Sequence, residues 1–268
     1  DAVCLLVAAI VVLDTLGAVA HGGGEALTWL VVMSLTFFVP AGLVLAELGA
    51  AFPAEGGPYV WTRLAYGPFA SALVAIVYWV ESAVWVGGSL SISAVAVVDR
   101  LVVGVDGPWR AVLALAFVWA AIAVAVAPLS IGKWIPVVGA ATQVALLGFF
   151  TWAVVVYAAR YGVHGIAAGS LVPSAGAFAA VAPVLLYNFL GLEVPSAAGD
   201  EMRDPQRDVP AAILRAGALT CVLYCVPVLA ILLVLPADGI TGLTGFVDAM
   251  AEVFVVFGGA ADAVGAVV

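Results

Sequence analysis

Charged residues are scarce in this chain. They make up only 9% of its 268 residues, whereas a soluble domain carries about a quarter. Hydrophobic residues make up 66% and the mean hydropathy is +1.25. The few charges separate apolar runs of about 20 residues, the length that an α-helix needs to cross a bilayer. Strict strand-like alternation is absent, which argues against a membrane barrel. Composition therefore predicts an all-α integral membrane protein.

Residues that build disulfide, metal and catalytic sites are also few. The three cysteines, Cys4, Cys221 and Cys225, all lie in apolar runs, so neither a disulfide framework nor metal-ligand spacing is present. His21 and His164 are far apart in the sequence. No Ser-His-Asp arrangement, phosphate loop or nucleotide fingerprint occurs. We therefore expect no cofactor, no metal site and no nucleic-acid partner, and we disfavour a membrane-embedded enzyme or a channel.

The apolar runs predict seven membrane-spanning helices and part of an eighth. They cover residues 2 to 21, 27 to 52, 69 to 98, 109 to 128, 133 to 159, 177 to 199 and 209 to 235, with another beginning near 244. Lys and Arg are more frequent in the connections that would be internal if the amino terminus is cytoplasmic. The chain begins at Asp1 and ends in an apolar run, so we expect a fragment of a multi-pass cell-membrane protein, with one transmembrane domain over residues 1–268.

A turn-rich polar segment separates the second and third predicted spans. Residues 46 to 68 read AELGAAFPAEGGPYVWTRLAYGP. Pro53, Gly56, Gly57 and Pro58 would end the preceding helix and force a compact loop. The residues from Tyr59 to Tyr66 then predict a short amphipathic segment at the membrane surface.

Two predicted spans contain polar residues and helix breakers at membrane depth. In the first, Asp14 lies within an apolar run, and Gly17 can release the helix from regular geometry. In the sixth, Pro183 precedes YNFLGLEVP, residues 187 to 195. We predict that both helices unwind there, the alternative for the first being a hydrated Asp14 inside an ordinary bundle. A second polar loop, DPQRDVP, follows at residues 204 to 210.

These motifs, in this order and spacing, closely resemble the signature loops of amino acid-polyamine-organocation permeases. The resemblance covers nearly the whole chain. It implies a LeuT-type fold of five-plus-five inverted repeats, truncated here after about seven and a half helices. The first repeat would cover about residues 1–160, and an incomplete second repeat about 177–268. A faint echo between Asp14-Thr15-Leu16-Gly17 and Asn188-Phe189-Leu190-Gly191 agrees with such repeats.

The resemblance also implies a substrate site at the two breaks. The first break would bind the carboxylate of an amino acid, and the sixth-helix break its amine. Tyr187 would cover the substrate, although it could equally be a packed helix tyrosine. The residues expected to bind substrate are Asp14, Thr15, Leu16, Gly17, Ala18, Tyr187, Asn188 and Gly191.

Two further acids at membrane depth, Glu193 and Glu81, are candidates for proton coupling or gating, because burial disfavours the charged form of a carboxylate. The alternatives are that Glu193 only binds backbone groups freed near Pro195 and that Glu81 is hydrated. If Asp14, Glu81 and Glu193 share one cavity, they would favour a cationic or amine-bearing substrate.

The expected function is therefore secondary active transport of amino acids or related amines by alternating access, with protons as a candidate coupling ion. The alternatives are a polyamine or cationic amine transporter and an antiporter that exchanges an amino acid for an amine. The partners expected are the small-molecule substrate and the lipid bilayer.

Overall fold

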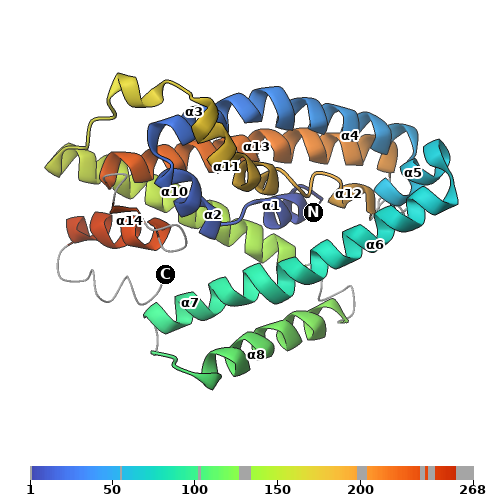
Figure 1. Ribbon diagram of the computed structural model, residues 1–268, viewed down its shortest axis with the longest axis horizontal. Coiled ribbons are helices and arrows are strands. Elements are labelled where there is room, and N and C mark those ends of the chain that lie inside the picture. The colour runs from blue at the N-terminus through green and yellow to red at the C-terminus, as the bar shows by residue number, and fades with distance from the viewer. Residues whose placement is uncertain are drawn as a thin grey trace. The chain divides into compact units, whose positions relative to one another are not determined.

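The regular secondary structure of the described chain is helical (Figure 1). The computed structural model describes residues 2–54, 56–101, 104–126, 134–197, 204–235, 239–240 and 245–257. Within these ranges the regular elements are all helices and none is a strand. The all-α prediction is therefore confirmed.

The helices follow the predicted spans in order. The first predicted span is α1 (Ala2–Ile10) with α2 (Asp14–His21), and the second is α3 (Gly23–Met33), the π-helix η1 (Ser34–Phe38) and α4 (Val39–Ala51), followed by α5 (Pro58–Tyr66). The third is α6 (Pro68–Val84), the π-helix η2 (Trp85–Leu90) and α7 (Ser91–Leu101), the fourth is α8 (Pro108–Ala125) and the fifth is α10 (Trp134–Tyr161). The 3₁₀ turn η3 (Ala168–Leu171) precedes the sixth, α11 (Ala175–Asn188) with α12 (Val194–Ala197); the seventh is α13 (Pro205–Val234), and α14 (Gly245–Phe254) and η6 (Val255–Phe257) come last.

Length and composition mark several of these elements as membrane spans. Four helical segments of the described chain are long and apolar enough to cross a bilayer: Gly23–Ala51, Pro68–Asp99, Trp134–Tyr161 and Gln206–Val234. Val3–Ile10 and Thr15–His21 form a fifth candidate, a span bent by 52° at its break. Pro108–Val124 and Ala175–Asn188 are shorter apolar helices. The predicted multi-pass architecture agrees with these segments.

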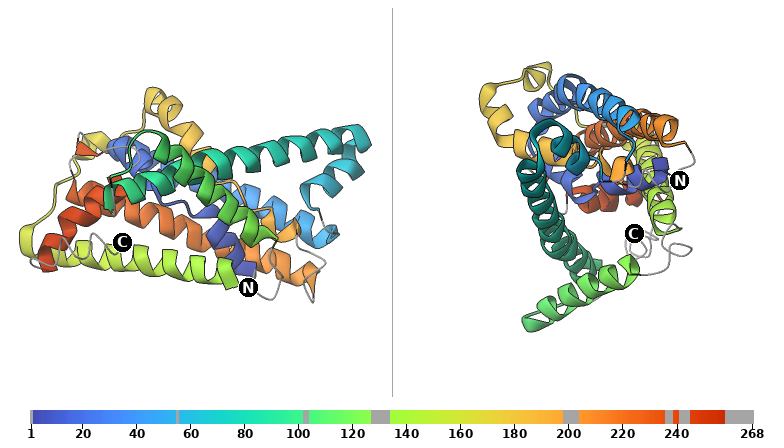
Figure 2. Two further views of the ribbon diagram at one scale, coloured as in Figure 1. Left: turned by 90° about the horizontal axis from the view of Figure 1, so that it is seen from below. Right: turned by 90° about the vertical axis from the view of Figure 1, so that its right-hand side faces the viewer.

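The described residues form two compact units. The larger comprises the described parts of Asp1–Gly57 and Pro136–Val264, and α13 is its central helix. Figures 1 and 2 show α13 beside α4, and it also contacts α1, α2 and α3. Small residues bring α4 and α13 close together: a Cβ on Gly49 would lie 2.6 Å from Val209 Cγ1. The buried apolar side chains of these helices form one continuous core.

The smaller unit comprises the described residues of Pro58–Ile135. Its α6, η2 and α7 form one long helix, and α8 packs against α7 and η2. The connection between α7 and α8 is held by Asp99, whose carboxylate accepts from the Val105 amide at 2.7 Å and pairs with the Arg110 guanidinium. Gly107, with φ +59°, is the N-cap residue directly before α8. This unit therefore has its own polar contacts at the end of its long helix.

Two local features refine the predictions from sequence. The segment from Tyr59 to Tyr66 is helical, as expected, within α5. The seventh span begins at Pro205 rather than near residue 209. Pro205 suits the first helical position, where no amide donor is needed, and the amide of Asp204 donates to the Asp208 carboxylate at 3.4 Å. The second polar loop thus supplies the first turn of α13.

Candidate functional site

The first span is broken between α1 and α2. Regular helix ends at Ile10, Val11–Leu13 lie outside any helix, and α2 begins at Asp14. We expected Gly17 to release the helix, but Gly17 lies inside α2, so the break is earlier than predicted. Gly17 instead allows close packing, since a Cβ on Gly245 of α14 would lie 3.1 Å from the Gly17 Cα.

Tyr224 of α13 satisfies backbone groups where this break begins. Its hydroxyl donates to the Ile10 carbonyl at 2.7 Å and accepts from the Val12 amide at 3.1 Å. The Tyr224 side chain is fully buried. Freed backbone groups are costly inside a membrane, so one hydroxyl stabilises the end of α1 and the start of the unwound segment together.

Two further side chains bind carbonyl groups in the same break. Gln143 of α10 donates from Nε2 to the Val11 carbonyl at 2.9 Å. Thr15 donates from its hydroxyl to the Val12 carbonyl at 2.8 Å. Gln143 Oε1 is buried, and no described residue is its hydrogen-bond partner. The first break is therefore held mainly by residues that are distant in sequence.

The sixth span is broken between Asn188 and Val194, as predicted. Gly191 in this segment has φ +103°, a backbone conformation that residues other than glycine rarely adopt. The Glu193 carboxylate accepts from the Gly191 amide at 3.2 Å, and the Glu193 carbonyl accepts from the Ser196 amide at 2.9 Å. This break is a series of tight turns that its own residues stabilise.

The two breaks adjoin each other. A Cβ added to Gly191 would lie 3.1 Å from Ile10 Cγ1 and 4.0 Å from Ala9 Cβ, so the turn of the sixth span rests on the end of α1. The first polar loop also reaches this region, because a Cβ on Gly57 would collide with the Ser196 hydroxyl of α12. Segments that are distant in sequence thus meet where both spans lose regular helix.

The residues predicted to bind substrate lie around these two breaks. Asp14 and Thr15 open α2, and they are followed by Leu16, whose side chain is fully buried in the apolar core, then by Gly17 and Ala18. Tyr187 and Asn188 end α11, and Asn188 is 1% exposed. Its amide oxygen and nitrogen have no hydrogen-bond partner within the described part of the chain. Asn188 is thus a buried side chain with unused hydrogen-bonding capacity at the sixth break.

The two candidate coupling acids lie in different units. Glu193 belongs to the larger unit, and its carboxylate binds the Gly191 amide of its own turn. A backbone contact of this kind is what the alternative of a purely structural Glu193 expects. Glu81 lies on α6 in the smaller unit and is exposed. A cavity shared by Asp14, Glu81 and Glu193 stays a prediction.

Sequence reasoning missed Tyr224, which supports the first break, and the buried Thr220 one turn before it. Tyr224 and Thr220 lie in the long apolar run of α13, and both are fully buried. They are four residues apart, so they lie on one face of the helix. Polar side chains repeating at this spacing within an apolar span were the available signal. What such a pattern cannot indicate is which backbone groups the side chains would meet.

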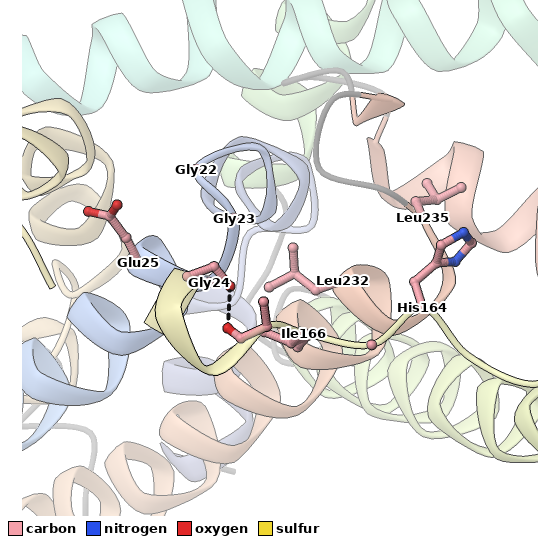
Figure 3. Close-up of a pocket in the computed structure, with 11 residues that line it drawn as sticks. Gly22, Gly23, Gly24, Glu25, His164, Ile166, Leu232 and Leu235 are labelled. Carbon is pink, nitrogen blue, oxygen red and sulfur yellow. Dashed lines mark hydrogen bonds between the residues drawn. The ribbon is translucent and has the colours of Figure 1, made fainter. Parts of the chain in front are cut away.

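A separate cavity of about 410 Å³ lies where α2 gives way to α3 (Figure 3). It is lined mainly by Gly22–Gly24, by the chain around Ile166, by Leu232 of α13 and by Leu235 directly after that helix. The side chains of Glu25 and His164 lie on opposite sides of the view in Figure 3. Glu25 already accepts a hydrogen bond from Ser174 at 2.6 Å. Charged groups therefore do not converge in this cavity, and the breaks are the better candidate site.

Comparison with known proteins identifies the family. The family model described as amino acid permease matches residues 1–268. The chain is 26% identical over 253 residues to a probable agmatine/putrescine antiporter of Lactococcus lactis, an alignment that covers 92% of this chain and 54% of the antiporter. It is 29% identical over 256 residues to an uncharacterized transporter of Legionella pneumophila, covering 90% of this chain and 53% of that protein.

The chain thus spans about half the length of the curated relatives that it matches. The family match and the apolar helices together make it part of a multi-pass membrane protein. The match over the whole sequence is decisive for the family, and it confirms the resemblance seen in the two signature loops. The chain belongs to the amino acid permease family.

Proposed function

We propose that the protein carrying this chain is a secondary transporter that moves amino acids or related amines across the cell membrane by alternating access. The observation that carries the proposal is the contact between two broken spans, where Gly191 rests on Ile10. Broken helices at membrane depth present backbone dipoles to a substrate, and such sites are tolerated only where protein or a cavity surrounds them. Family membership points to a transporter rather than an enzyme.

The ends of the helices suggest how a substrate would be oriented. The amino end of α2 carries the partial positive charge of the helix dipole and suits a carboxylate. The carboxyl end of α11, at Asn188, carries partial negative charge and suits an ammonium group. A zwitterionic amino acid would match both ends. Within this proposal Thr15 to Ala18 lie on the carboxylate side, and Tyr187 and Gly191 on the amine side.

An amine exchanger is the second candidate. One relative is named a probable agmatine/putrescine antiporter, and both of those compounds are amines. The acids Asp14 and Glu193 lie in the segments that form or flank the two breaks. A site with carboxylates and no Lys or Arg at the breaks would favour a cationic substrate. The proposed exchange of an amino acid for an amine would use the same two breaks.

Proton coupling through Glu193 or Glu81 is part of the proposal, as is the inverted-repeat organisation. Glu193 could release the Gly191 amide when it gains a proton, because a neutral carboxyl group accepts hydrogen bonds less strongly than a carboxylate. The sixth break would then loosen as the proton binds. Residues 1–160 would form the first repeat, and residues from 177 would begin the second.

The test is counterflow in proteoliposomes with the full-length protein that carries this sequence. Labelled alanine, agmatine and putrescine would each be exchanged against internal substrate, with and without a pH gradient. Counterflow of an amino acid supports the main proposal, whereas exchange of amines alone favours the second candidate. Ion conductance without counterflow would indicate a channel and contradict both.

Asp14→Asn tests the site within the same assay. If Asp14 binds the amine or couples charge, the counterflow rate of the neutral variant should be at least tenfold lower than that of the wild-type protein. The control is Asp106→Asn, which neutralises an exposed acid of the smaller unit. Equal rates in the two variants would remove Asp14 from the site.

A further inference from the structure

The hydroxyl of Thr220 differs from other hydroxyls in the described membrane helices. Thr36, Thr151 and Ser82 each donate to the carbonyl four residues earlier, at 2.7, 2.8 and 3.0 Å. This bond is available to any Ser or Thr in a helix, and it satisfies the hydroxyl without help from another element. Thr220 is 0% exposed, yet its hydroxyl has no hydrogen-bond partner among the residues that the structure describes.

Thr220 lies on the part of α13 that faces both breaks. One turn later, Tyr224 binds the backbone of the first break. Three residues earlier, a Cβ on Gly217 would lie 3.9 Å from Leu192 Cδ2, so this part of α13 also contacts the sixth break. Thr220 is between these two contacts on the buried face of the helix. Its hydroxyl is therefore held beside the place where the breaks meet.

Asn188 is the second buried side chain with unused capacity in this region. Asn188 is the last residue of α11. Its side-chain amide has no hydrogen-bond partner among the described residues. Thr220 Oγ1 and Asn188 Oδ1 are both neutral acceptors, and the carboxyl end of α11 adds partial negative charge. Neutral acceptors beside such a helix end suit a primary ammonium group, which donates three hydrogen bonds.

We propose that Thr220 is a further substrate-binding residue, whose hydroxyl accepts a hydrogen bond from the ammonium group of the ligand together with the Asn188 amide oxygen. The inference rests on the proposed function and names a residue of α13 that would determine affinity for amines. The two acceptors come from different spans, so the ammonium group would link the sixth span to the seventh. Binding would then favour the arrangement in which the two spans are in contact.

The test compares Thr220→Val with Thr220→Ser in the full-length protein. Valine keeps the shape of threonine and removes the hydroxyl, whereas serine keeps the hydroxyl. Affinity for alanine, agmatine and putrescine would be measured by ligand-induced shifts of the apparent melting temperature and by the KM of counterflow. Thr151→Val is the matched control, because that hydroxyl binds the Leu147 carbonyl of its own helix.

For each ammonium ligand that the wild-type protein binds, Thr220→Val should lower the affinity about tenfold. This is the effect expected for loss of one hydrogen bond to a charged group. Thr220→Ser and Thr151→Val should bind as the wild-type protein does. Without ligand, the melting temperature of Thr220→Val should be unchanged or higher, because a buried unpaired hydroxyl is removed.

Two results would overturn the inference while leaving the proposed function intact. One is wild-type affinity in Thr220→Val. The other is a ligand-free melting temperature lower in Thr220→Val than in Thr151→Val, which would show that the hydroxyl stabilises the fold itself. If the wild-type protein binds and exchanges none of the three ligands, the proposed function fails and the inference fails with it.

Discussion

The two broken spans differ in what stabilises them. The break between α1 and α2 is held from outside, by Tyr224 of α13 and Gln143 of α10. The break between α11 and α12 is held by its own residues, through the φ of Gly191 and the Glu193 carboxylate. A break held by distant side chains can change when those helices move. A break built from local turns needs no distant helix to keep its shape, so while Glu193 binds the Gly191 amide the sixth break provides the surface against which the first one is positioned.

Gly191→Val should have the largest effect, because it disturbs both breaks together. Valine is strained at φ +103°, and its Cβ would lie 3.1 Å from Ile10 Cγ1. We expect a loss of about 3 kcal/mol or more in the free energy of unfolding, measured as a lower apparent melting temperature, and no counterflow.

The control for Gly191→Val is Gly148→Ala in α10, where an added Cβ meets nothing within 4 Å. Alanine in a helix interior is favourable compared with glycine, so this variant should be at least as stable as the wild-type protein. Similar melting temperatures for the two variants would show that the sixth break is not as tightly built as described.

Tyr224→Phe should have the second largest effect, because it releases the first break alone. The Ile10 carbonyl and the Val12 amide would lose their buried partner, at a cost of about 2 kcal/mol. We expect α1 to detach more readily, which raises the labelling rate of Cys4 on α1 by a membrane-permeant thiol reagent. The measurement requires a background in which Cys221 and Cys225 are alanine.

Tyr161→Phe is the matched control, since Tyr161 is 60% exposed at the end of α10. It should leave Cys4 labelling and the melting temperature unchanged. If Tyr224→Phe behaves in the same way, Tyr224 does not hold the break.

Gln143→Leu should weaken the first break less than Tyr224→Phe does. The Val11 carbonyl loses its donor, but the unpaired Oε1 of Gln143 is removed as well. These effects oppose each other, so we expect a net change of about 1 kcal/mol or less. Double-mutant cycles with Tyr224→Phe would measure the coupling between the two side chains. A cost larger than that of Tyr224→Phe would make α10 the principal support of the break.

Glu193→Gln should have the smallest effect on stability. The glutamine oxygen can still accept from the Gly191 amide, so we expect a change of about 0.5 kcal/mol or less. If Glu193 couples protons, counterflow in this variant should no longer respond to a pH gradient. A melting temperature as low as that of Gly191→Val would show that the charge itself holds the sixth break.

Much of the fold could be predicted from the sequence, because the apolar runs and the two signature loops are strong signals. The sixth break was located correctly, since Gly191 and Pro195 disfavour a regular helix locally, whereas Pro183 lies inside α11. The first break was placed too late, because Gly17 is a breaker by type but a packing residue in the structure. The sequence alone does not show that Gly245 of α14 packs against Gly17.

The candidate site was only partly predictable, for a related reason. Asp14, Asn188 and Glu193 were visible as polar residues at membrane depth. Tyr224 acts across helices, and the role proposed for Thr220 likewise depends on which face of α13 meets the breaks. Local patterns identify residues that disturb their own helix, whereas residues that support a distant segment become evident only from tertiary contacts.

A cryo-electron-microscopy structure of the full-length protein in lipid nanodiscs, with the ligand that shows counterflow, would test the central claim most directly. The account predicts ligand density between the segment Ile10–Leu13 and the segment Asn188–Glu193, within hydrogen-bonding distance of Asn188. Ligand density confined to the cavity around Gly22–Gly24 and His164, with the two breaks in contact and no ligand between them, would contradict it.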